Sequence, residues 1–258
     1  MGGRGSSFKT NANTNIKFSD NGSFEPLINA QNDSISERNN DLIDILQDDN
    51  INICESTDSF KTENMNPNIK KVYEMTQQFS GVSKSLRNSQ LDIRGAKFSG
   101  STVACFSYNP WNKENMTIFL NANLASLSKE QIESKTKVQV DKKFWAPCDK
   151  ENLINQDVAH EYGHFVQKLI FEKQMDKNLT RNMSAKQIDN YEKMLALKCK
   201  KDILKIQKER FNKTDDFISR YGSKSNFEFF AETFSNLMTS KKPTTLAKSL
   251  EIYIKENL

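Results

Sequence analysis

The sequence predicts an α+β fold in which a flexible N-terminal arm precedes a small, mostly antiparallel sheet and a larger helical part. Three observations indicate this order. Residues 1–60 are rich in Asn, Ser, Asp and Gly, two runs of β-forming residues follow after residue 100, and helix-capping signals dominate from residue 128 onward. A chain of 258 residues is long enough for one or two domains with a substantial core.

We expect residues 1–60 to form a disordered arm. A segment with so little apolar surface cannot offset the conformational entropy that it would lose on folding. Within the arm, 41-DLIDILQDD-49 has the apolar spacing of a short amphipathic helix. The folded domain is predicted to span residues 66–258.

The sheet is predicted from two short runs of β-forming residues. A helix over 69–79, with Pro67 in its first turn, precedes them. The runs are 101-STVACFSYN-109 and 116-MTIFLN-121, and 110-PWNKEN-115 has the composition of the turn between them. Strand 116–121 is a candidate open edge that could pair with an extended peptide, and an interior strand paired on both sides is an equally supported alternative.

Helices are predicted for most of the chain after Ser128. Ser128 and Ser184 each have a Gln three residues later, which is the spacing of a capping box. A further helix is predicted over 150–173, and a loop runs into a last apolar helix over 217–238. The segment of about 175–213 is predicted to be a Lys-rich helical region, since the wider stretch from residue 168 to residue 213 contains 13 Lys and Arg against six Asp and Glu.

Both histidines of the chain lie in 158-VAHEYGHFV-166. On a helix, His160 and His164 are one turn apart on the same face, so both imidazoles can bind one ion, and imidazole is a common zinc ligand. Glu161 is next to the pair and can accept a proton from a metal-activated water. Gly163 permits close approach of another segment, although it weakens a helix interior by about 1 kcal/mol relative to Ala.

The third metal ligand must be Asp, Glu or Cys, because the chain has no further histidine. The segment 228-EFFAE-232 places Glu228 and Glu232 on one face of an apolar helix, where charges are costly unless they are paired or bound to a metal. We expect Glu228 to bind the metal and Glu232 to accept a hydrogen bond from the free ring N–H of a ligand histidine. The alternative is a core helix whose glutamates reach solvent.

These residues resemble the gluzincins, the zinc metallopeptidases that combine HExxH with a later Glu. The stretch 221-YGSKSNFEFFAETF-234 is similar to the conserved region of anthrax lethal factor-like peptidase domains and of related zincins from bacteriophages and mobile elements. The resemblance covers 158–171 and 217–238 and implies a zincin-like catalytic domain with one Zn²⁺ per chain. It implies the metal ligands His160, His164 and Glu228, the general base Glu161, the oxyanion hydrogen-bond donor Tyr221, and Glu232 as the partner of a ligand histidine.

The resulting expectation is a zinc-dependent endopeptidase that hydrolyses a peptide or protein substrate. One alternative is a phage-type head-assembly or structural protein with a minor or inactive zincin domain, since the start MGGRGSS resembles glycine-arginine-rich ends of phage head-morphogenesis proteins. Another is a nucleic-acid-associated protein that uses the Lys-rich segment, although the net charge of +4 does not favour nucleic acid as a partner. The sequence shows no signal peptide and no apolar run that could span a bilayer, so we expect a cytoplasmic protein without membrane contact, with virion association as an alternative.

Overall fold

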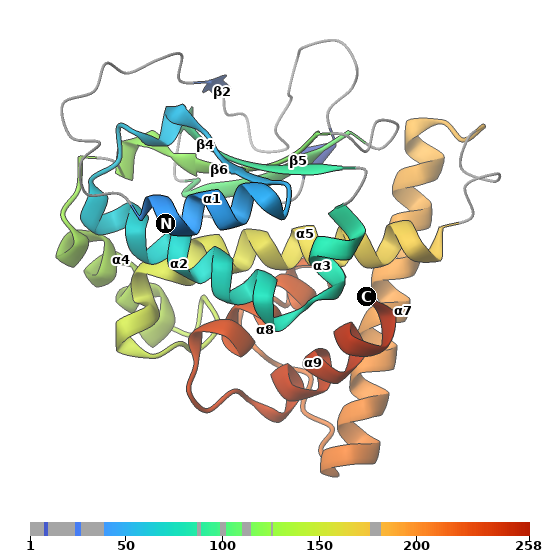
Figure 1. Cartoon of the computed structure of the whole chain (residues 1–258). Helices are drawn as coiled ribbons and strands as arrows, with labels where there is room; N and C mark the ends of the chain where they lie inside the picture. The colour runs from blue at the N-terminus through green and yellow to red at the C-terminus, as the bar shows by residue number, and fades with distance from the viewer. Residues whose placement is uncertain are drawn as a thin grey trace. The chain divides into compact units, whose positions relative to one another are not determined.

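A computed structural model of the chain describes residues 8–9, 24–26, 39–86, 89–98, 102–109, 115–124, 126–175 and 182–258. Their architecture is α+β, as predicted (Figure 1). The chain divides into two compact units, residues 1–134 and 135–258. The division falls within helix α4 (Lys129–Asp141), which begins with the predicted capping box: the Ser128 amide lies 2.9 Å from Gln131 Oε1, and the Gln131 amide lies 3.3 Å from Ser128 Oγ.

The first unit contains a small mixed sheet with the strand order β1-β5-β6-β4-β2, in which β3 also pairs with β4. The strands are β1 (Phe8–Lys9), β2 (Phe24–Pro26), β3 (Ile51–Ile53), β4 (Gln90–Phe98), β5 (Ala104–Tyr108) and β6 (Asn115–Asn121). The expectation of a mostly antiparallel sheet is wrong. β4 is parallel to both β3 and β6, and β1 is parallel to β5, while β2–β4 and β5–β6 are antiparallel. The helical connection from β3 to β4 explains the first parallel pair, because a helical crossover returns the chain in the same direction.

The strand predicted over 116–121 is interior, so the candidate open edge is wrong and the alternative, a strand paired on both sides, is confirmed. In β6, Ile118 is in register with Phe106 of β5 on one side and with Ile93 of β4 on the other. Residues 116–120 are all buried. A run of consecutive buried residues is typical of a strand covered on both faces, and it lacks the alternation of a solvent-facing strand.

The helices of the first unit are α1 (Asn40–Asp48), α2 (Thr62–Gln78) and α3 (Gly81–Ser85), with short 3-10 turns at Glu55–Thr57 and Ala122–Leu124. α1 confirms the short amphipathic helix, and Figure 1 shows α1 and α2 on the same side of the sheet. α2 begins five residues before Pro67, so this proline lies in the second turn and not in the first. Of the arm predicted over residues 1–60, residues 39–60 are part of this unit, and the rest lies outside the described residues except for β1 and β2.

The second unit is helical and carries the predicted site residues. A 3-10 helix (Lys150–Asn155) leads into α5 (Gln156–Gln174), and α7 (Ala185–Phe211), α8 (Asn226–Thr239) and α9 (Thr245–Asn257) follow. The capping box predicted at the start of α7 is confirmed, since Ser184 and Gln187 exchange backbone-to-side-chain hydrogen bonds. α8 packs against α5, α7 and α9. Among the described residues, no helix has both the length and the apolar character that crossing a lipid bilayer requires.

Candidate metal centre

The close packing of α5 and α8 depends on Gly163. A Cβ atom built on Gly163 would lie 3.0 Å from Ala231 Cα and 3.0 Å from Phe234 Cβ, both on α8. Such distances are tighter than nine in ten real Cβ contacts, so a larger residue would require α5 or α8 to shift by a few tenths of an ångström. One residue before, the ring of Tyr162 stacks on Phe234 at a centroid distance of 6.0 Å. The turn of α5 that carries the histidines is therefore held directly against α8.

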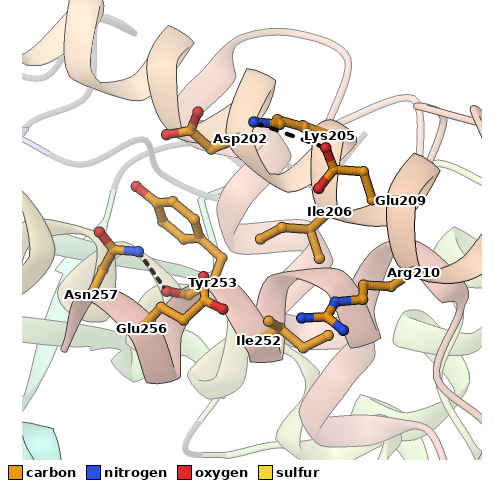
Figure 2. A pocket seen from close by; sticks show the side chains of 9 residues that line it. All are labelled: Asp202, Lys205, Ile206, Glu209, Arg210, Ile252, Tyr253, Glu256 and Asn257. Atoms are coloured by element: carbon orange, nitrogen blue, oxygen red, sulfur yellow. Dashed lines mark hydrogen bonds and ion pairs between the residues drawn. The ribbon is translucent and has the colours of Figure 1, made fainter.

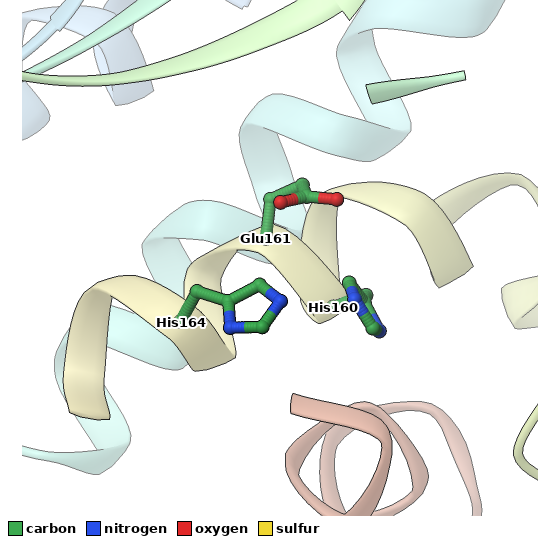
Figure 3. A group of neighbouring side chains, drawn as sticks. All are labelled: His160, Glu161 and His164. Carbon is green, nitrogen blue, oxygen red and sulfur yellow. The ribbon is translucent and has the colours of Figure 1, made fainter. Parts of the chain in front are cut away.

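His160, Glu161 and His164 form a compact cluster on α5. All three side chains are buried, and one ligand atom from each lies within 4.8 Å of the other two. Figure 3 shows the two imidazole rings next to one another, with the Glu161 carboxylate above them. This group could hold a metal ion.

Glu228 reaches the two histidines from α8. Its Oε2 atom lies 3.1 Å from His160 Nε2 and 3.5 Å from His164 Nε2. Glu228 is in the first turn of α8, where its backbone N–H donates to Ser225 Oγ at 3.1 Å. The fixed start of the helix thus aims the carboxylate at the point where both Nε2 atoms meet.

The buried polar atoms of this group fit a cation. Among the described residues, His164 Nδ1 and Nε2 and both Glu228 carboxylate oxygens have no hydrogen bond, and the two side chains are almost completely buried. Burial of polar atoms without hydrogen bonds is costly, whereas coordination of a metal ion would satisfy His164 Nε2 and the carboxylate. The residues present therefore suit a metal centre with two nitrogen ligands and one carboxylate ligand.

Burial and the neighbouring side chains shift the pKa values of His164 and Glu228. Burial lowers the pKa of His164 below its usual value, although the nearby Glu228 carboxylate opposes this effect. Burial by itself would raise the pKa of Glu228, but His164 and His160 more than reverse this, and the carboxyl pKa is held well below its usual range. A neutral imidazole and an ionised carboxylate are the forms that bind metals.

Glu232 holds His160 from the side away from Glu228. Its Oε1 atom lies 2.8 Å from His160 Nδ1, which is the contact that the sequence led us to expect. Its Oε2 atom accepts hydrogen bonds from the Ala146 backbone N–H and from Ser219 Oγ, the latter at 2.9 Å. With an N–H at Nδ1 donating to Glu232, the Nε2 atom of His160 is the ring nitrogen with a lone pair, directed at Glu228 and His164.

Tyr221 lies beside the same histidine. Its ring centroid is 5.7 Å from that of His160, and its side chain is buried. The backbone N–H of Tyr221 donates to the Phe144 carbonyl at 3.0 Å, and the N–H of Arg220 donates to the Lys143 carbonyl at 2.9 Å. These hydrogen bonds join the segment before α5 to the loop before α8, so both form one wall of the site.

Sequence reasoning brought together His160, Glu161, His164, Tyr221, Glu228 and Glu232, and the structure places all six in this site. It missed the contacts of Ser219 and of the Ala146 amide with Glu232. Ser219 also accepts the Gly222 N–H at 2.8 Å, and this links the loop before α8 to the carboxylate. A serine hydroxyl and a backbone amide have no distinctive sequence pattern, so the sequence held no signal for either contact.

A separate hollow of about 270 Å³ lies between α7 and α9 (Figure 2). Acidic and basic side chains alternate around it, and Lys205 pairs with Glu209 at 3.9 Å. None of the six predicted site residues lines it. Its lining is Asp202, Lys205, Ile206, Glu209, Arg210, Ile252, Tyr253, Glu256 and Asn257.

Comparison of the chain with family models, curated proteins and solved structures finds no match. The functional argument therefore rests on the geometry of the site.

Proposed function

We propose that the chain is a zinc-dependent endopeptidase of the gluzincin type, in the branch of anthrax lethal factor-like and phage- or mobile-element-encoded zincins. The observation that carries this proposal is the meeting of Glu228 Oε2 with the Nε2 atoms of His160 and His164, at 3.1 Å and 3.5 Å. Two imidazoles and a carboxylate are a known ligand set of catalytic zinc, which keeps a fourth position for water or substrate.

Zinc held by His160, His164 and Glu228 would act as a Lewis acid and make an adjacent water more acidic. Glu161 takes the proton of the attacking water and delivers it to the leaving amine. Its carboxylate is suited to this role because it lies beside the ligand atoms, on the turn that carries both histidines. Tyr221 donates its phenol proton in a hydrogen bond to the oxyanion that forms on the scissile carbonyl.

Two further contacts support the assignment. Glu232 fixes the tautomer of His160, as carboxylates commonly do for zinc-bound histidines. The ring of Tyr221 packs against His160 and is anchored by the backbone of Phe144, so its position is built into the fold. A phage-type structural protein with an inactive zincin domain would have no need to keep all of these groups in place.

The first experiment measures zinc per chain by elemental analysis. The wild type is expected to bind about one zinc, as catalytic single-metal sites do, and Glu228→Ala to lose most of it. Glu256→Ala is the matched control, because it removes an exposed glutamate from α9. A folded wild type that takes up no zinc would refute the proposal and favour the alternative of a structural or head-assembly protein.

The second experiment tests catalysis with a peptide library. The wild type is expected to hydrolyse peptides, whereas Glu161→Gln retains zinc and fold but loses turnover, since an amide cannot accept the proton. Turnover at the wild-type rate in Glu161→Gln would remove Glu161 from its role as general base.

A further inference from the structure

The wall of the site formed by the segment before α5 and the loop before α8 carries several exposed positive charges. Lys143, Arg220 and Lys224 are exposed on it, and we call these three residues the cationic rim. Lys143 and Arg220 are joined by a backbone hydrogen bond of 2.9 Å. Lys143 has a left-handed backbone with φ of 54°, which turns the chain sharply before Phe144.

Lys224 is the rim residue that lies near the proposed reaction centre. Its Nζ atom lies 4.2 Å from the ring centroid of Tyr221 and 5.7 Å from that of Phe144. The Tyr221 ring in turn lies 5.7 Å from His160. The ammonium group is therefore separated from a proposed metal ligand by a single aromatic ring.

The charge of the rim is not balanced locally. Segments 142–148 and 217–227 contain no Asp or Glu. The three rim residues form no ion pair with another residue in the described ranges, whereas the lysines of α7 often do, as in Lys193–Asp189 and Lys198–Asp202 at 2.7 Å each. Uncompensated charges beside a binding site raise the local concentration of oppositely charged ligands.

We propose that the cationic rim selects acidic peptide segments as substrates, with Lys224 placed to bind a carboxylate next to the scissile bond. The inference rests on the proposed peptidase function and adds to it the chemical class of the substrate. Lys224 acts here as a specificity-determining residue, because it is exposed whereas the proposed metal ligands are buried.

An acidic peptide fits the rim better than a nucleic acid does. Single-stranded nucleic acids bind to proteins by stacking bases on exposed aromatic rings beside basic residues. Of the five aromatic residues in segments 142–148 and 217–227, Phe217 alone is exposed, while Trp145 and Tyr221 are almost completely buried. The ammonium of Lys224 lies over the rings of Phe144 and Tyr221, so the rim offers one free ring where a strand of stacked bases would need several. The carboxylates of an acidic peptide can bind to the exposed side chains of the cationic rim without any aromatic ring.

The test measures binding separately from hydrolysis. In the full chain with Glu161→Gln, which prevents turnover, fluorescence anisotropy compares two labelled peptide mixtures of equal length that differ only in Glu or Gln at alternate positions. The rim variant adds Lys143→Gln, Arg220→Gln and Lys224→Gln. The matched control adds Lys186→Gln, Lys201→Gln and Lys208→Gln, three exposed lysines of α7 that belong to no ion pair with another described residue. A thermal unfolding curve for each variant confirms that it is folded.

We expect the parent to prefer the Glu mixture, and the rim variant to lose about tenfold in affinity for it, because each exposed ion pair contributes up to about fivefold. The α7 control should keep the preference, and added salt should weaken it. Lys224→Glu alone should favour the Gln mixture.

The proposal fails if the parent binds both mixtures equally or not at all, or if the rim variant and the α7 control lose the same affinity. Tighter binding of a single-stranded oligonucleotide than of the Glu mixture would also overturn it. If the chain prefers the Glu mixture but the wild type hydrolyses no peptide, the proposal for the cationic rim is supported and the peptidase function is refuted. If the wild type hydrolyses peptides but the chain shows no preference for the Glu mixture, the peptidase function is supported and the proposal for the rim is refuted.

Discussion

His160 is held between two glutamates of the same helix: Glu232 Oε1 lies 2.8 Å from its Nδ1 atom, and Glu228 Oε2 lies 3.1 Å from its Nε2 atom. The two carboxylates are one turn apart on α8, so they reach opposite nitrogens of one ring. Glu232 orients the ring, and Glu228 lies with His160 Nε2 at the position proposed for the metal.

The first prediction concerns the orienting carboxylate. Glu232→Gln should lower zinc affinity by about 10- to 100-fold, because a carboxylate bound to the far nitrogen of a ligand histidine fixes its tautomer and raises its basicity. Competition with a chromophoric chelator measures this affinity. Ser219→Ala is the control, since it removes one hydrogen bond to Glu232 and leaves the contact with His160 in place. Equal losses in both variants would mean that Glu232 acts only through packing.

The second prediction concerns Tyr221. Tyr221→Phe keeps the ring that packs against His160 and removes only the hydroxyl. We expect kcat to fall by about 100-fold or more, as after loss of one oxyanion donor, with zinc content and KM little changed. Steady-state kinetics and elemental analysis on the same preparation check both. Loss of zinc from the phenylalanine variant would instead make the hydroxyl part of the metal centre.

The third prediction uses the contact between α5 and α8. In an exposed helix, Gly→Ala stabilises by about 1 kcal/mol. At Gly163 we expect the opposite sign, a loss of about 1–3 kcal/mol in the free energy of unfolding, because the new methyl group would meet α8 at 3.0 Å. Zinc affinity should fall as well, since Glu228 would be moved away from the histidines. Urea unfolding with and without chelator measures both effects, and a more stable Gly163→Ala variant would show that the helices are less closely packed than described.

The parts of the structure that could be predicted from the sequence are those set by local spacing. The capping boxes at Ser128 and Ser184 depend on residues three positions apart. The histidine pair and the glutamate pair each occupy i and i+4 of one helix, so their shared faces follow from helix geometry alone.

Long-range pairing could not be predicted in the same way. β4 was not anticipated as a strand, and its position beside β6 turns the expected edge into an interior strand. The partners of the Glu232 Oε2 atom come from residues 13 and 86 positions away, and a hydroxyl and an amide give no pattern to detect. Both failures have one cause, which is that contacts between distant segments depend on the fold as a whole.

The fourth prediction concerns a buried ion pair that joins α5 to the Lys-rich α7. Lys168 Nζ lies 3.0 Å from Glu192 Oε1, and both side chains are almost completely buried. Lys168→Met alone should cost about 3–5 kcal/mol in the free energy of unfolding, because it leaves a buried carboxylate without this partner. Adding Glu192→Leu should recover much of the lost free energy of unfolding. Chemical denaturation of the two single variants and the double variant gives the coupling, and strictly additive losses would contradict it.

The last prediction is a pH dependence in the first unit. Burial by itself would raise the pKa of Asp92 on β4, but hydrogen bonds from Gln90, Arg94 and Asn52 outweigh it, and the pKa is lowered in the folded state. A carboxyl with a lowered folded pKa contributes stability above its unfolded pKa of about 3.9, and this contribution is lost as the pH falls through the folded pKa.

Asp92→Asn should therefore be less stable than the wild type at neutral pH, and the difference should shrink steadily as the pH falls below about 4. Urea titrations followed by circular dichroism at a series of pH values measure the difference. A stability difference for Asp92→Asn that stays constant from pH 7 to about pH 3 would mean that the side chain acts through packing and not through its charge.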